Sequence, residues 1–203
     1  RTPMMASFLN EAALNPYWNV PPDLAAERIA PKVIEKGMGY LTSNGYQLLS
    51  DWGDNPKVLD PATVDWQAVA DGRIQVRLRQ LPGPGNSLGK VKFTFPNPYG
   101  IYLHDTPDKA LFARDIRTFS ESCVRLEQAM VLAQHTLRQL DGWDEERLQS
   151  EIETLRQQTL RLPEPIPVYV IYLTSWVDDD GLVHFREDVY QRERILAGYY
   201  PAR

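Results

Sequence analysis

The chain has 203 residues, of which 43% are hydrophobic and 24% charged, and its formal net charge at pH 7 is −5. These values are typical of an ordinary globular protein of one domain, or of one domain with an insertion, that is long enough to bury a proper core. The negative charge and the absence of a Lys/Arg cluster argue against nucleic acid as a partner, and no apolar run approaches the length of a membrane span.

The first eighty residues predict a succession of short elements. A strand is expected from Met4 to Leu14, and the proline-rich stretch after it suits no regular element. Asp23 is expected to cap a helix that continues through Ile34. A short strand should then lie within residues 40–49, and a helical turn within residues 64–69.

The middle of the chain predicts a β-hairpin that ends at a histidine. Lys90–Phe95 alternates polar and apolar residues, and the β-prone Ile101–His104 should pair with it across a turn rich in Pro and Gly. The second strand stops at Asp105-Thr-Pro107. His104 should therefore lie where the strand becomes a loop.

The single cysteine of the chain, Cys123, follows this hairpin. Apolar residues after it recur at helical spacing, which predicts a helix of about four turns that starts at the cysteine itself. The unpaired N–H groups and the positive end of such a helix would favour the thiolate, and His104 could serve as its base. Most free cysteines are buried small side chains, however, and Ser120 could simply be the helix N-cap, so spacing alone leaves both interpretations open.

The last third of the chain predicts a helix and a second hairpin. Asp144 should cap the helix, and Pro163–Pro167 is interpreted as a linker. Val168–Trp176 is the segment with the strongest strand pattern, and Asp178–Gly181 should turn it into Val183–Phe185.

Three segments carry a combination of motifs that is more specific than spacing. They are Pro84–Asn97 (PGNSLGKVKFTFPN), Ile101–Pro107 (IYLHDTP) and Phe119–Arg125 (FSESCVR). Together they resemble the catalytic domain of L,D-transpeptidases, in the large YcbB-like branch of the YkuD-domain family. The resemblance extends to Leu14–Pro22, Gly39–Leu41 and Val64–Trp66 and so covers most of the chain.

The resemblance implies a mainly β fold with α-helices. We expect a YkuD-like β-sandwich, or mixed sheets, with a catalytic helix and a capping insertion. The whole chain, 1–203, would be the catalytic domain. An approximate capping subdomain at 20–80 would be inserted ahead of a catalytic core at 81–203 that ends in the C-terminal hairpin.

It also implies a two-step acyl transfer on peptidoglycan. Cys123, activated by His104, would attack the carbonyl of an L-centre residue in a tetrapeptide stem and expel D-alanine. An amine of a neighbouring stem's diaminopimelate would then take the thioester, which gives a 3→3 cross-link. In this family a backbone carbonyl commonly orients the histidine, so Asp105 need not belong to a triad. No metal or organic cofactor is required, and His135 and His184, without clustered partners, are interpreted as non-catalytic.

Further site residues follow from the same resemblance. Ser122, Ser120 and Tyr102 would support the oxyanion or the nucleophile. Arg125, Tyr102 and Trp52 would bind substrate. The alternatives are a strand aromatic for Tyr102, a salt bridge at the helix start for Arg125, and packing for Trp52.

One departure from the family pattern lies directly before the cysteine. The family usually has Gly there, preceded by Ser or His, whereas this chain has Glu121-Ser122. Glycine allows unusual dihedral angles and close substrate approach, which Ser122 would restrict. An inward-pointing Glu121 would disfavour the thiolate. We expect Glu121 to face solvent and the backbone geometry to be kept.

Two other classes of function stay open. One is a non-catalytic peptidoglycan-binding or regulatory module, and the other is a cysteine L,D-carboxypeptidase that gives the thioester to water. The resemblance points to the periplasm, where a free thiol suits a catalytic role. It names peptidoglycan stem peptides as partners, with other cell-wall synthesis proteins as further candidates. Since the chain starts at Arg1 without an initiator Met, we expect a piece of a longer exported protein whose signal or membrane anchor lies upstream.

Overall fold

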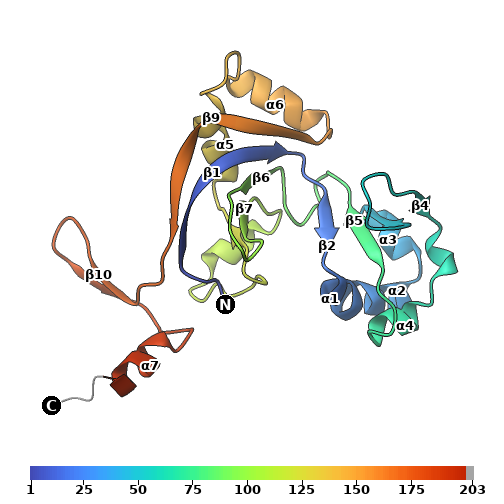
Figure 1. Ribbon diagram of the computed structural model, residues 1–203, viewed down its shortest axis with the longest axis horizontal. Coiled ribbons are helices and arrows are strands. Elements are labelled where there is room, and N and C mark those ends of the chain that lie inside the picture. Colours follow the sequence, from blue (N-terminus) through green and yellow to red (C-terminus); the bar gives the residue numbers. More distant parts are fainter. Residues whose placement is uncertain (200–203) are drawn as a thin grey trace.

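The computed structural model describes residues 1–199, which form a main body, a side lobe and a C-terminal arm (Figure 1). The main body contains a five-stranded mixed sheet with the strand order β8-β7-β6-β1-β9. Its strands are β1 (Met5–Leu14), β6 (Val91–Thr94), β7 (Tyr102–His104), β8 (Val124–Arg125) and β9 (Gln158–Val170). The β-rich architecture with peripheral helices agrees with the fold class predicted above.

One face of this sheet forms the core of the main body. Residues alternate between the two faces of a strand, so Leu14, Val91 and Phe93 point to the same side. They pack against α5 (Ala129–Leu137) and α6 (Glu145–Glu153) in one buried cluster. Complete burial of such a side chain contributes roughly 1.5–3 kcal/mol. The predicted hairpin is confirmed, because β6 and β7 pair antiparallel, and Asp144 caps α6 as predicted.

The interpretation of Pro163–Pro167 as a linker is wrong, because these residues lie inside β9. Proline cannot donate a ladder hydrogen bond and is tolerated only where its missing N–H would face solvent. β9 is an edge strand whose single neighbour is β1. Three prolines at alternate positions place their missing N–H groups on the same side of the strand, which suits the outer side of an edge.

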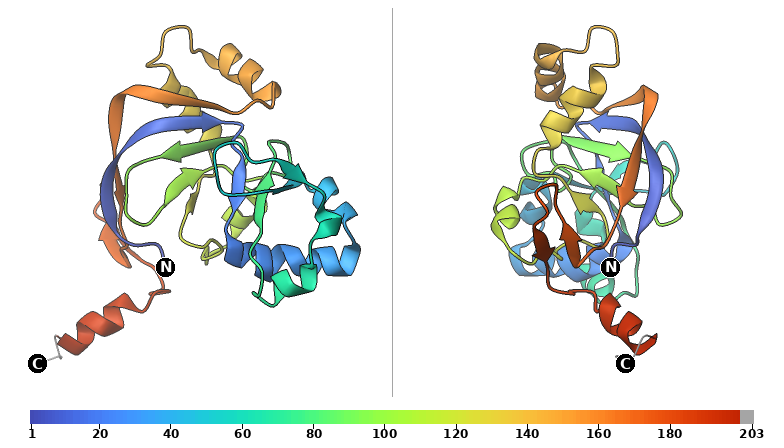
Figure 2. Two further views of the ribbon diagram at one scale, coloured as in Figure 1. Left: turned by 45° about the vertical axis from the view of Figure 1, so that its right-hand side comes forward. Right: turned by 90° about the vertical axis from the view of Figure 1, so that its left-hand side faces the viewer.

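The side lobe, residues 18–80, is built on a second sheet with the order β2-β5-β3-β4 (Figure 2). Its buried cluster includes Val33, Trp66 and Leu78. The strands are β2 (Trp18–Val20), β3 (Tyr46–Leu49), β4 (Val58–Leu59) and β5 (Arg77–Gln80). The helical segments are α1 (Pro22–Leu24), the π-helical η1 (Ala25–Ile29), α2 (Ala30–Lys36), α3 (Gly39–Ser43), the 3₁₀-helical η2 (Pro61–Thr63) and α4 (Trp66–Ala70).

Two predictions for this lobe need correction. Asp23 is not the N-cap, because the helix already begins at Pro22, whose fixed φ suits the first helical position. The Asp23 carboxylate instead accepts a hydrogen bond from the N–H of Leu24 within the first turn. The strand expected within residues 40–49 is confirmed only from Tyr46 onward, since Gly39–Ser43 is helical.

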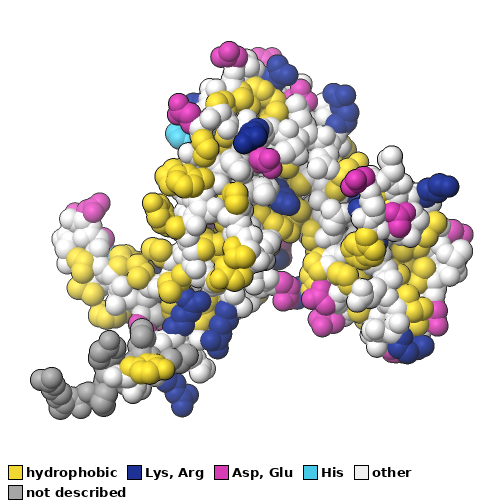
Figure 3. Space-filling view, viewed as in Figure 1, with side chains coloured by type: hydrophobic (Ala, Val, Ile, Leu, Met, Phe, Trp, Pro, Cys, Tyr) yellow, Lys and Arg dark blue, Asp and Glu magenta, His cyan; other side chains and the backbone are white. Residues whose placement is uncertain are grey.

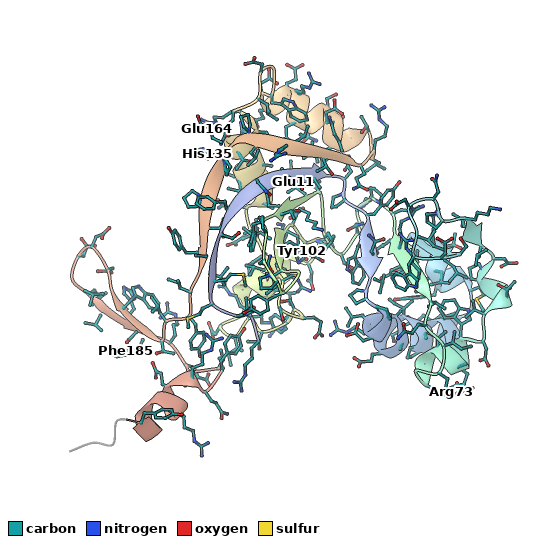
Figure 4. All side chains as sticks on the ribbon, viewed as in Figure 1. Glu11, Arg73, Tyr102, His135, Glu164 and Phe185 are labelled. Atoms are coloured by element: carbon teal, nitrogen blue, oxygen red, sulfur yellow. The ribbon has the colours of Figure 1, made fainter. Side chains whose placement is uncertain are left out.

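The C-terminal arm, residues 171–199, projects from the main body (Figures 1 and 2). It contains a hairpin formed by β10 (Ser175–Val177) and β11 (Val183–Phe185), and the helix α7 (Arg192–Tyr199). The turn and second strand are as predicted, but the single strand expected at Val168–Trp176 is wrong. β9 ends at Val170, opposite the first residue of β1, and residues 171–174 separate it from β10. Its base is joined to the start of the chain, where the Arg192 guanidinium donates to the carbonyl of Thr2 at 3.3 Å. Apolar side chains are exposed along it (Figure 3). Phe185, labelled in Figure 4, is one of them. Within residues 1–199, no helix has the length and apolar character needed to cross a bilayer.

Candidate active site

His104 is the last residue of β7 and is 5% exposed. Its Nδ1 lies 2.5 Å from the backbone carbonyl oxygen of Asp105, which can only accept. Nδ1 therefore carries the proton, and Nε2 is left as the basic nitrogen. The Asp105 carboxylate is held elsewhere, by the ammonium of Lys109 at 2.7 Å and the N–H of Lys90 at 2.9 Å. A backbone carbonyl thus orients the imidazole, as expected, and Asp105 lies outside any triad.

The surroundings of His104 keep its imidazole neutral. Burial is the main cause that lowers the pKa of His104 to about 4, and the positive charges of Arg125 and Lys92 act in the same direction. The hydrogen bond to the Asp105 carbonyl opposes them. A neutral imidazole at pH 7 can accept a proton from a thiol.

The helix after Cys123 does not begin at the cysteine. Val124–Arg125 forms β8, which pairs in parallel with β7, and α5 begins only at Ala129. The apolar spacing around Val124 and Leu126 fits a strand as well as a helix, and pairing with β7 decides between them. The dipole of α5 therefore does not act on the sulfur, and Ser120 does not cap a helix.

The pairing of β7 with β8 brings Cys123 beside Tyr102. Leu103 is level with Val124 and His104 with Arg125, so the next step back along both strands joins Tyr102 to Cys123. The two side chains are close enough to interact electrostatically. Burial raises the pKa of Tyr102 above its usual value, which keeps the hydroxyl protonated and able to donate. The Tyr102 and His104 rings meet edge to face at 5.6 Å.

The loop before the cysteine is tied at three points. The Ser120 hydroxyl donates to the carbonyl of Cys123 at 2.5 Å, and the carbonyl of Ser122 accepts from the Thr2 hydroxyl at 3.0 Å. The Glu121 carboxylate is 61% exposed and pairs with the Arg28 guanidinium of the side lobe at 2.6 Å. The expectation that Glu121 faces solvent is confirmed.

Ser122 has a φ of 102°, a conformation that favours glycine. The glycine that the family usually carries at this position is therefore explained by the backbone. We expect Ser122→Gly to relieve strain on the order of 1 kcal/mol, in part offset by the greater freedom of glycine in the unfolded chain. Urea unfolding should show Ser122→Gly to be at least as stable as Ser122→Ala, which keeps a Cβ and lacks the hydroxyl. A glycine variant clearly less stable than the alanine variant would contradict this account.

Two cavities meet at Cys123. The smaller, of about 400 Å³, lies between the side lobe and the main body, where the surface is notched (Figure 3). Trp18 and Arg28 line it from the side lobe, and His104 lines it from the main body. The larger, of about 530 Å³, is bordered by Tyr190 and by the loop between η3 (Lys109–Ala113) and Cys123.

The predicted site residues divide between these cavities and the surface. Ser120 and Arg125 line both cavities, and Tyr102 lines the smaller one. Trp52 lines neither cavity and is 58% exposed. The Arg77 guanidinium lies over its indole ring, 5.8 Å from the ring centroid.

Arg125 is the least satisfied polar side chain of the site. It lies in β8 and not at a helix start, so the alternative of a salt bridge at a helix start is wrong. Its Nε is buried and has no hydrogen-bond partner within residues 1–199. In the same part of the chain, no group of three or more His, Cys, Asp or Glu side chains is arranged to hold a metal ion. His135 lies on α5, away from Tyr102 (Figure 4).

Comparison with known proteins gives the class to which this fold and site belong. The family described as the YkuD L,D-transpeptidase catalytic domain matches residues 1–152, and the chain belongs to this family. Over 196 residues it is 35% identical to a protein of Haemophilus influenzae (strain ATCC 51907 / DSM 11121 / KW20 / Rd) named "Putative L,D-transpeptidase". That match covers 97% of this chain and 38% of the relative, so the chain spans well under half of the relative's length. The predicted family membership and fold class are confirmed.

Proposed function

We propose that this chain is a peptidoglycan L,D-transpeptidase that forms 3→3 cross-links through a thioester on Cys123. Membership of the YkuD family supports L,D-transpeptidase activity and a cell-envelope setting. The observation that carries the finer proposal is the position of Cys123, which shares one cavity with His104 and lies at the junction of two cavities. A transferase needs such access, because the donor and acceptor stems must both reach one sulfur.

In the first half-reaction, His104 Nε2 takes the proton of the Cys123 thiol, and the sulfur attacks the L-centre carbonyl of the donor stem. The backbone N–H of Cys123, which has no acceptor within residues 1–199, is available to the oxyanion. The imidazolium then protonates the departing amine, and D-alanine leaves as the thioester forms.

In the second half-reaction, the acceptor amine attacks the thioester carbonyl and passes a proton to His104. The tetrahedral adduct collapses, the C–S bond breaks, and the proton returns to the sulfur. The unpartnered Nε of Arg125, level with His104 on the sheet, suits a carboxylate of either stem.

We propose further that residues 20–80 act as a capping subdomain. Trp18, just before this range, together with Leu24 and Arg28, supplies one wall of the smaller cavity. The ion pair between Arg28 and Glu121 joins this wall to the loop of the nucleophile. The cap would exclude water from the thioester, which favours transfer to an amine over hydrolysis. We place the enzyme in the periplasm.

Intact-protein mass spectrometry tests the nucleophile. Incubation with a carbapenem, a β-lactam that acylates this family, should add one drug mass to the native chain and nothing to Cys123→Ala. A folded native chain without an adduct would favour a non-catalytic wall-binding module.

A second experiment separates transfer from hydrolysis. The chain is incubated with tetrapeptide muropeptides, with and without an amine acceptor, and the products are separated by mass. A 3→3 dimer that requires the acceptor supports the proposal, whereas tripeptide formed equally in both reactions would identify a carboxypeptidase.

A further inference from the structure

Lys92 lies on the same face of the main sheet as the candidate catalytic pair. Its Cα is the antiparallel partner of His104, and side chains of paired residues leave a sheet on the same side. The side chain is partly buried, and its ammonium lies 4.2 Å from the centroid of the Tyr102 ring, well within cation–π range.

Lys92 does not itself face the cavities that meet at Cys123. It lines a separate hollow of about 430 Å³, together with Glu11, Thr94 and Tyr102. Tyr102 borders both this hollow and the smaller cavity at Cys123. Lys92 therefore acts on Cys123 and His104 from outside the two cavities, through its charge and through its contact with Tyr102.

Two groups attract the Lys92 ammonium: the carboxylate of Glu11 and the sulfur of Cys123. Burial lowers the pKa of Lys92, while the Coulomb attractions of Cys123 and Glu11 oppose that shift. Glu11 also lies opposite Arg161 in the pairing of β1 with β9. Glu11 and Tyr102 are both labelled in Figure 4. On the far side of His104, Arg125 adds a second positive charge.

We propose that Lys92 is a positioning residue for the transfer reaction: its ammonium fixes the Tyr102 ring against His104, aims the Tyr102 hydroxyl at the Cys123 sulfur, and thereby favours the thiolate. The inference rests on the function proposed above. The field of the ammonium and the hydroxyl hydrogen bond act together, because both stabilise negative charge on sulfur. An uncharged side chain at this position loses both the cation and the fixed ring.

The test is the rate of Cys123 alkylation by iodoacetamide between pH 5 and pH 10, in four proteins of confirmed secondary structure. Lys92→Met should lower the rate at pH 7 several-fold, because the cation and the fixed ring that stabilise negative charge on the sulfur are lost. Lys92→Arg, which keeps the cation, should restore most of the rate. Lys57→Met, which removes an exposed lysine of the side lobe, should match the native chain.

A further background tests the route through Tyr102. In Tyr102→Phe, which keeps the ring and removes the hydroxyl, Lys92→Met should lower the alkylation rate less than it does in the native chain, because only the direct field of the ammonium on the sulfur is left to lose. An undiminished effect of Lys92→Met in this background would overturn the role given to the Tyr102 hydroxyl. Equal profiles for Lys92→Met and Lys57→Met, or failure of Lys92→Arg to restore the rate, would overturn the proposal. Alkylation needs neither donor nor acceptor stem, so a failed transpeptidase assay would leave this readout intact and would count only against the proposed function.

Discussion

The variant His104→Gln should acylate Cys123 about 10²- to 10⁴-fold more slowly than the native chain, the usual contribution of a general base. The amide of glutamine can still donate to the Asp105 carbonyl, but it cannot take a proton from the thiol at neutral pH. The measurement is the pseudo-first-order rate of carbapenem adduct formation at pH 7. His135→Gln is the matched control, because it makes the same replacement on the exposed surface of α5. If His104→Gln forms the carbapenem adduct as fast as the native chain, His104 is not the general base.

The same substitution should change how stability depends on pH. The pKa of His104 is lowered to about 4 in the folded chain from the ordinary histidine value of 6.5, with burial as the main cause. Between these values the unfolded chain binds a proton that the folded chain does not, so the native fold loses stability as pH falls. The loss should approach about 3 kcal/mol near pH 4 and be absent from His104→Gln. Urea unfolding at pH 7 and pH 4.5 measures it; equal losses in both proteins would contradict the assigned burial effect.

Local signals in the sequence were sufficient to place His104. The alternation of Lys90–Phe95, the short apolar run before His104 and the Asp-Thr-Pro stop are all contained within eighteen residues, and the hairpin they predict is present. The register of that hairpin would also have indicated Lys92 as the cross-strand neighbour of His104. The link from Lys92 to the cysteine could not be predicted, because Tyr102 is brought beside Cys123 only by the parallel pairing of β7 with β8.

Long-range pairing explains what the sequence did not reveal. The run of residues after Cys123 fits a helix by its spacing. The start of that run instead pairs with β7 as a strand, so the helix begins only at Ala129. The wall of the smaller cavity formed by Trp18 depends on how the side lobe sits against the main body. Trp52, an equally large aromatic of the same lobe, is exposed away from both cavities. No local pattern separates these two tryptophans.

Gly89→Ala should be the most damaging single methyl addition near the site. Gly89 has a φ of +61°, and an added Cβ would lie 2.6 Å from the Cβ of Asp105, closer than real contacts allow. Asp105 is 6% exposed and is held by Lys109 and by the backbone of Lys90, so it has no room to move aside. Backbone strain and overpacking together should cost about 3 kcal/mol of unfolding free energy.

Two glycines serve as controls that separate the causes. Gly100 has a φ of +65° with nothing within 4 Å of an added Cβ, so Gly100→Ala isolates the backbone strain. Gly85 has neither feature, and Gly85→Ala should be close to neutral. The cost of the clash is therefore the difference between the losses of unfolding free energy in Gly89→Ala and Gly100→Ala, measured in urea. Equal losses in the two variants would rule the clash out. The clash should also affect the chemistry, because the Asp105 carbonyl orients His104. A displaced Asp105 should slow carbapenem acylation in Gly89→Ala, while Gly85→Ala, which lines neither cavity at Cys123, acylates at close to the native rate.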